Sequence, residues 1–221
     1  MQTTAIISIV EMAGTMAFAI SGIRLAAAKQ FDLFGAYVVG LVTAIGGGTI
    51  RDVLLGLTPI WMEQKIYLII TALSLIFVIA MGKRLLLFKN TFFIFDTIGL
   101  ALFTVVGLDK SLDAGFPLWV AIIMGVVTGS FGGVLRDMMV GDVPLLFRRD
   151  IYALASLVGG ALLGLLTACG VSESYSFVGS ALSIIIMRLL AMKYHLHLPT
   201  LAYSEEKDSR ISVHAQRERE R

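Results

Sequence analysis

One six-residue motif occurs twice in this chain, 85 positions apart and without a gap in the alignment. The first copy, residues 47–52, reads Gly-Gly-Thr-Ile-Arg-Asp, and the second, residues 132–137, reads Gly-Gly-Val-Leu-Arg-Asp. Both copies lie inside long apolar runs, where an ionisable pair is costly unless it faces protein or water. The fold must therefore shelter the same polar group twice within an apolar surrounding.

Composition places the chain in a bilayer. Of its 221 residues, 57% are hydrophobic and 15% are charged, with a mean hydropathy of +0.85, whereas soluble domains carry about 25% charged residues. The net charge of +2 is too small to indicate nucleic-acid binding. The single cysteine, Cys169, excludes an internal disulfide. No phosphate-binding loop or hydrolase motif occurs, so we expect no enzymatic activity and no cofactor.

Seven apolar runs are long enough to cross a membrane as helices, since about 20 residues are needed and backbone groups have no water partner in lipid. The predicted fold is an all-α membrane protein. The seven predicted spans are Thr4–Ile23, Phe34–Leu57, Lys65–Gly82, Thr91–Leu108, Pro117–Val140, Asp150–Cys169 and Tyr175–Lys193.

The basic residues predict the orientation. They gather in alternate loops, and the side with more lysine and arginine is expected to be cytoplasmic. The N-terminus would then lie outside and the C-terminus inside, in the inner membrane of a cell. Residues 204–221 are mixed in charge and predict a disordered cytoplasmic tail. Lys83, Arg84 and Lys89 form a basic cluster that either contacts anionic lipid headgroups or only fixes the topology.

The repeat extends beyond the motif. At the same offset Glu11 matches Asp96 and Tyr67 matches Tyr152, so spans one to three match spans four to six. Because three spans are an odd number, the second copy enters the membrane from the opposite side, which gives an inverted repeat with a site between the copies. We expect repeats over residues 1–86 and 87–170, a seventh helix over residues 171–195, and a tail over residues 196–221.

The glycines of the motif allow two interpretations. Clustered glycines allow a helix to kink and to expose backbone carbonyls to a water-filled path, or they allow two helices to pack closely. We favour the kink because the glycines recur beside ionisable residues. The predicted kink and pore-lining residues are Gly46, Gly47, Gly48, Thr49, Gly132 and Gly133.

The ionisable residues at membrane depth are the candidates for pore electrostatics and gating. Neighbouring residues on a helix point about 100° apart, so each arginine is free to meet an acid of another helix. Glu11 and Asp96 are the obvious partners, because each lies in the first helix of its repeat. The alternative is a set of structural ion pairs. The candidates are Glu11, Arg51, Asp52, Asp96, Arg136 and Asp137.

Two copies of Gly-Gly-x-x-Arg-Asp, three helices each, plus a seventh helix, resemble the prokaryotic branch of the trimeric intracellular cation (TRIC) channel family. The resemblance covers residues 5–195. It implies a homotrimer in the lipid bilayer, with a pore inside each subunit between the repeats, kinked second and fifth helices, and passage of potassium and, less selectively, sodium. Bound phospholipid is left open. The same branch is also labelled a glycine transporter, which implies transport of a small zwitterion, and a purely structural role is a third alternative.

Overall fold

The computed structural model describes residues 2–87, 91–148 and 150–199. Within these ranges the chain is almost entirely helical. The long helices are α1 (Gln2–Ala28), α2 (Leu33–Leu55), α4 (Ile66–Leu87), α5 (Thr91–Asp113), α6 (Leu118–Met139), α7 (Ala153–Ala168) and α8 (Glu173–Lys193). The short elements are α3 (Ile60–Glu63) and the 3-10 helix η1 (Leu145–Phe147).

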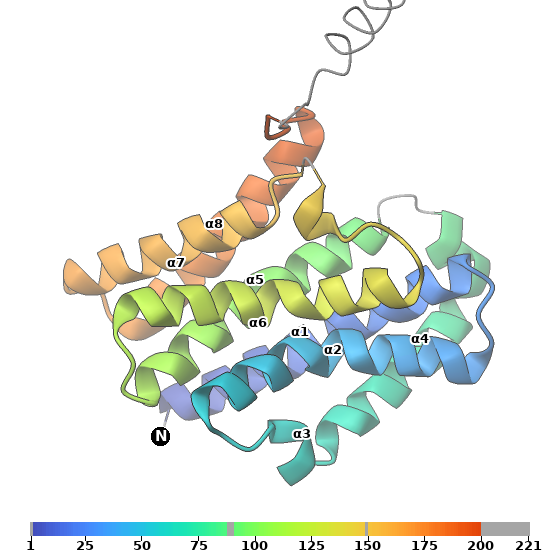
Figure 1. Ribbon diagram of the computed structural model, residues 1–221, viewed down its shortest axis with the longest axis horizontal. Helices are drawn as coiled ribbons and strands as arrows, with labels where there is room; N and C mark the ends of the chain where they lie inside the picture. Colours follow the sequence, from blue (N-terminus) through green and yellow to red (C-terminus); the bar gives the residue numbers. More distant parts are fainter. Residues whose placement is uncertain (1, 88–90, 149, 200–221) are drawn as a thin grey trace, which may run out of the picture.

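Four helices form the centre of the molecule. The most extensive helix contacts are those of α5 with α6, α2 with α6, α1 with α5, and α1 with α2. Figure 1 shows α4 beside α1 and α2 at one edge of this group, and α7 and α8 at the opposite edge. The first two helices of each predicted repeat therefore lie together, and the third helix of each lies outside them.

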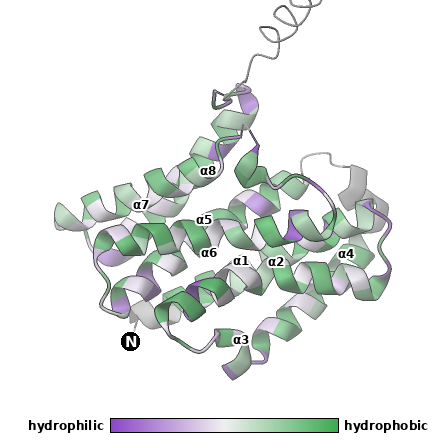
Figure 2. Ribbon diagram, viewed as in Figure 1, coloured by the Kyte–Doolittle hydropathy of each residue, from purple (hydrophilic) through white to green (hydrophobic). Residues whose placement is uncertain are grey.

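The helices have the composition of membrane spans. Five of them, α1, α2, α5, α6 and α8, are long and apolar enough to cross a membrane, while Ile66–Gly82 of α4 and Ala153–Ala168 of α7 are shorter apolar helices. Figure 2 shows hydrophobic residues along all of these helices. Each predicted span thus has its helix, and the all-α membrane fold is confirmed.

Several predicted boundaries need correction. The sequence places Asp109 and Lys110 in a loop, but α5 continues to Asp113 and both residues lie within its last turns. The sixth span begins at Ala153 and not at Asp150, because Asp150, Ile151 and Tyr152 are not helical. The predicted end of the third span needs no correction, because α4 is interrupted at Gly82, whose φ of 47° and ψ of −133° are open to glycine but strained for other residues.

The two repeats also share their connecting segments. Helix α3 begins directly after Pro59, and η1 begins directly after Pro144, the residue at the same place in the second copy. Proline is well suited to this place because its fixed φ and missing N–H fit the start of a helix. The predicted tail over residues 204–221 and Lys89 lie outside the described residues, as do the side chains of Lys83 and Arg84.

Candidate functional site

The repeated glycines lie where α2 crosses α6. A side chain on Gly47 would overlap the carbonyl oxygen of Thr128, and one on Gly132 would overlap the carbonyl oxygen of Thr43. Thr43 and Thr128 are themselves 85 positions apart. The contact is therefore reciprocal, as expected where a pseudo-twofold axis relates two inverted repeats. We call Thr43, Gly47, Thr128 and Gly132 the glycine crossing.

The kinks predicted at these glycines do not break either helix. Helices α2 and α6 are each continuous through their glycines, and none of Gly46, Gly47, Gly48, Gly132 and Gly133 is among the residues with positive φ. The alternative reading, close packing, describes this conformation. Without a side chain at Gly47 and Gly132 the two backbones come into direct contact, which a Cβ at either position would prevent.

Beyond the crossing, the second repeat buries an ionic cluster. Arg136 Nη1 lies 2.6 Å from Asp96 Oδ1 and 2.9 Å from the hydroxyl of Ser21 on α1. Its Nε donates to Asp137 Oδ1 at 2.8 Å, and the backbone N–H of Leu145 donates to Asp137 Oδ2 at 2.9 Å. Arg136 and Asp96 are fully buried. Asp96, one of the two acids named as candidate partners for the arginines, is thus bound to Arg136.

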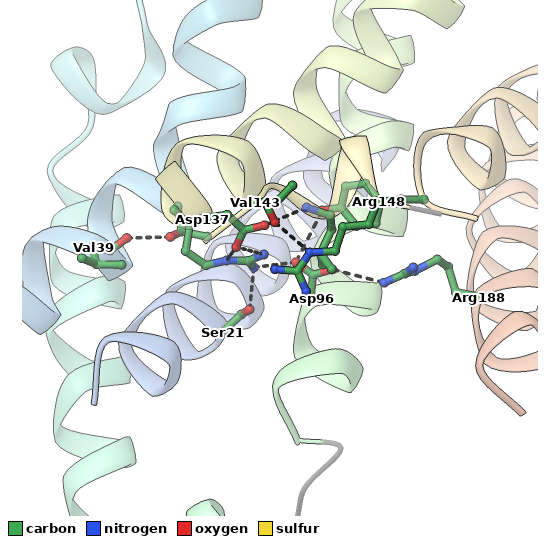
Figure 3. A network of polar contacts seen from close by, with 11 residues as sticks. Ser21, Val39, Asp96, Asp137, Val143, Arg148 and Arg188 are labelled. Carbon is green, nitrogen blue, oxygen red and sulfur yellow. Dashed lines mark hydrogen bonds and ion pairs between the residues drawn. The ribbon is translucent and has the colours of Figure 1, made fainter. Parts of the chain in front are cut away.

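Arg188 of α8 belongs to the same cluster, although the sequence analysis did not select it. Its Nη2 lies 3.4 Å from Asp96 Oδ2, and its guanidinium stacks on the rings of Phe93 and Tyr152, 4.3 and 4.8 Å from their centroids. The hydroxyl of Tyr152 donates to Asp96 Oδ1 at 3.4 Å. Figure 3 shows Asp96 between Asp137 and Ser21 on one side and Arg188 on the other. We call Asp96, Arg136, Asp137 and Arg188 the Asp96 cluster.

The corresponding residues of the first repeat are arranged differently. Arg51 is fully buried and bonds Asp52 Oδ1 through Nε at 2.8 Å and Nη2 at 2.6 Å. Its Nη1, like Nη2 of Arg136, has no hydrogen-bond partner. Glu11 does not pair with Arg51; it forms an ion pair of 2.8 Å with Lys110 of the second repeat. Glu11, one of the two acids named as candidate partners for the arginines, is therefore bound to a lysine instead, and the sequence did not predict Lys110 as its partner.

Smaller contacts complete the first half. The backbone N–H of Ile60 lies 3.4 Å from Asp52 Oδ2, in the place that Leu145 takes beside Asp137. The indole N–H of Trp61 donates to the hydroxyl of Thr49 at 3.0 Å. Both arginine–aspartate pairs thus fasten the turn after their helix, but only the second pair is also joined to the acid of the first helix in its repeat.

Comparison with known proteins identifies the chain's relatives. A family model described as "Glycine transporter" matches residues 8–83 and again residues 93–170. A UPF0126 membrane protein of Vibrio cholerae is 38% identical, with 91% of this chain and 85% of the relative covered. The UPF0126 inner membrane protein YadS of Escherichia coli is 36% identical, with 88% and 96% covered.

Solved structures agree with these matches. The TRIC trimeric intracellular cation channel orthologue from Rhodobacter sphaeroides shares 32% identity and a TM-score of 0.82, over 86% of this chain and 99% of that chain. A prokaryotic TRIC channel solved in 0.5 M KCl shares 29% identity and a TM-score of 0.81, over 87% of this chain and 98% of that chain. The resemblance inferred from the duplicated motif is confirmed: the chain belongs to the membrane-protein family that this model describes, together with the UPF0126 proteins and the prokaryotic TRIC channels.

Proposed function

We propose that this protein is a monovalent-cation channel, permeable to potassium, that assembles as a homotrimer with a separate path inside each subunit. The proposal rests on the likeness to solved TRIC cation channels over nearly the whole of those chains. Nothing in the site calls for chemistry on a bound substrate. The path would run between the two repeats, along the faces of α2 and α6 that carry the repeated motif.

Within the structure itself, the proposal is supported by the pair of buried ionic groups on either side of the glycine crossing. Arg51 with Asp52 and Arg136 with Asp137 lie beyond the crossing at opposite ends of antiparallel helices. Charged residues buried in membrane helices are rare and mark ion or substrate pathways. In this conformation the two backbones are in direct contact at the crossing, and we infer that conduction requires α2 and α6 to separate there.

The difference between the two repeats suggests how the path opens. The second arginine is bound to the acid of the first helix in its repeat, and the first arginine is not. We infer that these are two arrangements of one duplicated switch, with the Asp96–Arg136 contact as the closed one. Parting that contact would free Asp96 and let α6 move away from α1 and α5.

A matched tyrosine pair tests the switch. Tyr152→Phe removes the hydroxyl that donates to the Asp96 carboxylate at 3.4 Å. Because this bond is long, we expect it to contribute no more than an ordinary hydrogen bond, about 0.5–1.5 kcal/mol. The open probability in single-channel recordings should therefore rise about 2- to 10-fold. Tyr67→Phe, at the same place in the first repeat, is the control and should leave the open probability unchanged. Equal effects of the two substitutions would contradict the assignment of the switch to the second repeat.

The function itself is tested in planar bilayers. The purified protein in potassium chloride should give unitary currents whose reversal potential, in a salt gradient, follows the cation. A protein that inserts and stays trimeric but gives no cation-selective current would refute the channel.

Asp52→Asn and Asp137→Asn, compared in liposome flux assays, should change the flux without abolishing membrane insertion.

A second candidate function is secondary transport of glycine or another small zwitterion. The description of the matching family model favours it, and an arginine beside an aspartate offers partners for both a carboxylate and an ammonium group. Saturable uptake of labelled glycine into proteoliposomes, without stepwise current, would support this function and contradict the channel.

A further inference from the structure

A cavity of about 440 Å³ opens at the end of the molecule where α1 begins and α5 ends, well away from the Asp96 cluster. Its charged lining comes from α1, α5 and α8, and its other polar residues lie on α1, next to α3 and at the start of α4. The ionisable residues are four acids and one lysine, which leaves a formal charge of −3. They are Glu11, Asp109, Lys110, Asp113 and Glu173. We call this cavity the acidic vestibule.

One acid of the vestibule is buried without a partner. Asp109 is only 6% exposed and lines the cavity, yet among the described residues no hydrogen bond or ion pair joins its carboxylate to another group. The nearby Lys110 bonds Glu11 instead. The nearest cation is thus shared with another acid, and a nearly buried carboxylate gains from a further counter-charge, so the carboxylate of Asp109 is suited to a cation that comes from solution.

The acidic residues that α5 contributes to the vestibule have no acidic counterparts in the first repeat. The residue 85 positions before Asp109 is Arg24, a base in place of an acid. The positions matching Lys110 and Asp113 are Leu25 and Ala28. The two repeats share the arginine–aspartate motif, but they carry opposite charges at the matching positions Arg24 and Asp109.

The vestibule also leads toward the buried pairs. Tyr67 lines it and lies within electrostatic reach of Glu11, Arg51 and Asp52. A cation held in the vestibule is therefore close to Tyr67, which is coupled electrostatically to the first arginine–aspartate pair. Within the described ranges, no three acids or other ligand side chains converge as in a chelating metal site. This geometry fits a hydrated monovalent cation held by the field of several carboxylates, and not a dehydrated divalent ion.

We propose that the acidic vestibule is a binding site for hydrated monovalent cations, with Asp109, Asp113 and Glu173 as its free carboxylates and Lys110 as a tethered cation that neutralises Glu11. Its role in conduction rests on the proposed channel function, whereas the site itself can be measured without current. A cavity lined by one sign of charge raises the local concentration of counter-ions by about 10-fold or more.

The local potential can be measured with a reporter cysteine. In a Cys169→Ser background, which removes the exposed native thiol, Gln64→Cys lies in the vestibule, while Met62→Cys is exposed on α3 but does not line it. Cationic and anionic methanethiosulfonates are then compared. At about 20 mM salt, the rate of modification by the cationic reagent divided by the rate for the anionic reagent should be about 10-fold higher at position 64 than at position 62. It should fall to the level of position 62 at about 1 M salt, where the Debye length is about 3 Å.

Neutral variants complete the test. Asp113→Asn with Glu173→Gln removes two exposed acids with little risk to folding, and Asp109→Asn is then added; each step should lower the ratio at position 64. Glu63→Gln, an exposed acid at the same end but outside the vestibule, should not. In bilayers, the double variant should lower low-salt conductance for cations entering from the vestibule about 2- to 3-fold.

The outcomes separate the two proposals. A high ratio at position 64 that depends on these acids, in a protein that carries no current, supports the cation site and contradicts the channel. Equal ratios at positions 64 and 62, or an equal loss with Glu63→Gln, overturn the cation site even if the protein conducts.

Discussion

Replacing Asp96 with asparagine should lower the free energy of unfolding by about 3–5 kcal/mol, the usual cost of breaking a buried ion pair by removing one partner. Asp96 is fully buried and faces two cations, Arg136 at 2.6 Å and Arg188 at 3.4 Å. When Asp96 loses its charge, Asp137 is the only carboxylate left in the Asp96 cluster, which holds two buried guanidinium groups. Unfolding of the purified protein in mixed micelles, followed by circular dichroism against added denaturing detergent, measures the loss.

The matching acid of the first repeat provides the control. Glu11→Gln removes the partner of Lys110, whose side chain is 21% exposed and reaches the vestibule. The lysine can therefore be hydrated when its partner is lost, and the expected cost is within about 1 kcal/mol. Equal losses for Asp96→Asn and Glu11→Gln would contradict the unequal roles that we assign to the two halves.

The positions of the helices follow from the sequence because a bilayer imposes a simple rule on length and polarity. Every predicted span has its helix, and the pairing of Arg136 with Asp96 was expected from the repeat. The end of α5 was not, because hydropathy falls at Asp109 while the helix continues to Asp113. Charge ends an apolar run but does not end a helix, and the vestibule exists because the last turns of α5 are both helical and acidic.

Contacts between helices were harder to predict because they depend on how each helix is rotated. Duplication alone suggests that Glu11 meets Arg51 as Asp96 meets Arg136, and the structure has the second contact without the first. One missed residue did carry a signal. Arg188 interrupts the apolar run of the seventh span, and a charge at that depth has to face a protein partner or water. Its partner, Asp96, is identified only by the packing of α8 against α5.

The glycines show a different limit, since one residue type serves two structural purposes. Glycine weakens a helix and also allows close approach of another backbone. The sequence alone does not show which of these two effects a given glycine has. The structure separates them through what a side chain would touch. A Cβ at Gly132 would overlap the Thr43 carbonyl, whereas the atom nearest to one at Gly48 is Arg51 Nη2, at 3.7 Å.

Gly132→Ala should therefore lower the free energy of unfolding by about 1–3 kcal/mol, the usual cost of overpacking a core. The added methyl group meets backbone, which cannot turn aside as a flexible side chain does, so α2 and α6 must move apart at the crossing. Gly47→Ala meets the Thr128 carbonyl in the same way and should have a similar effect. The same detergent unfolding assay measures both variants.

Gly48→Ala is the control that decides between packing and a kink. It adds the same methyl group one position from Gly47, on the same helix, where the methyl group makes only an ordinary van der Waals contact with Arg51. Because alanine favours a helix over glycine by up to about 1 kcal/mol, this variant should be neutral or more stable. If the glycines served mainly as a helix break, all three alanines would stiffen the helices alike and none would destabilise the fold. A loss confined to Gly47 and Gly132 is the result that the reciprocal crossing requires.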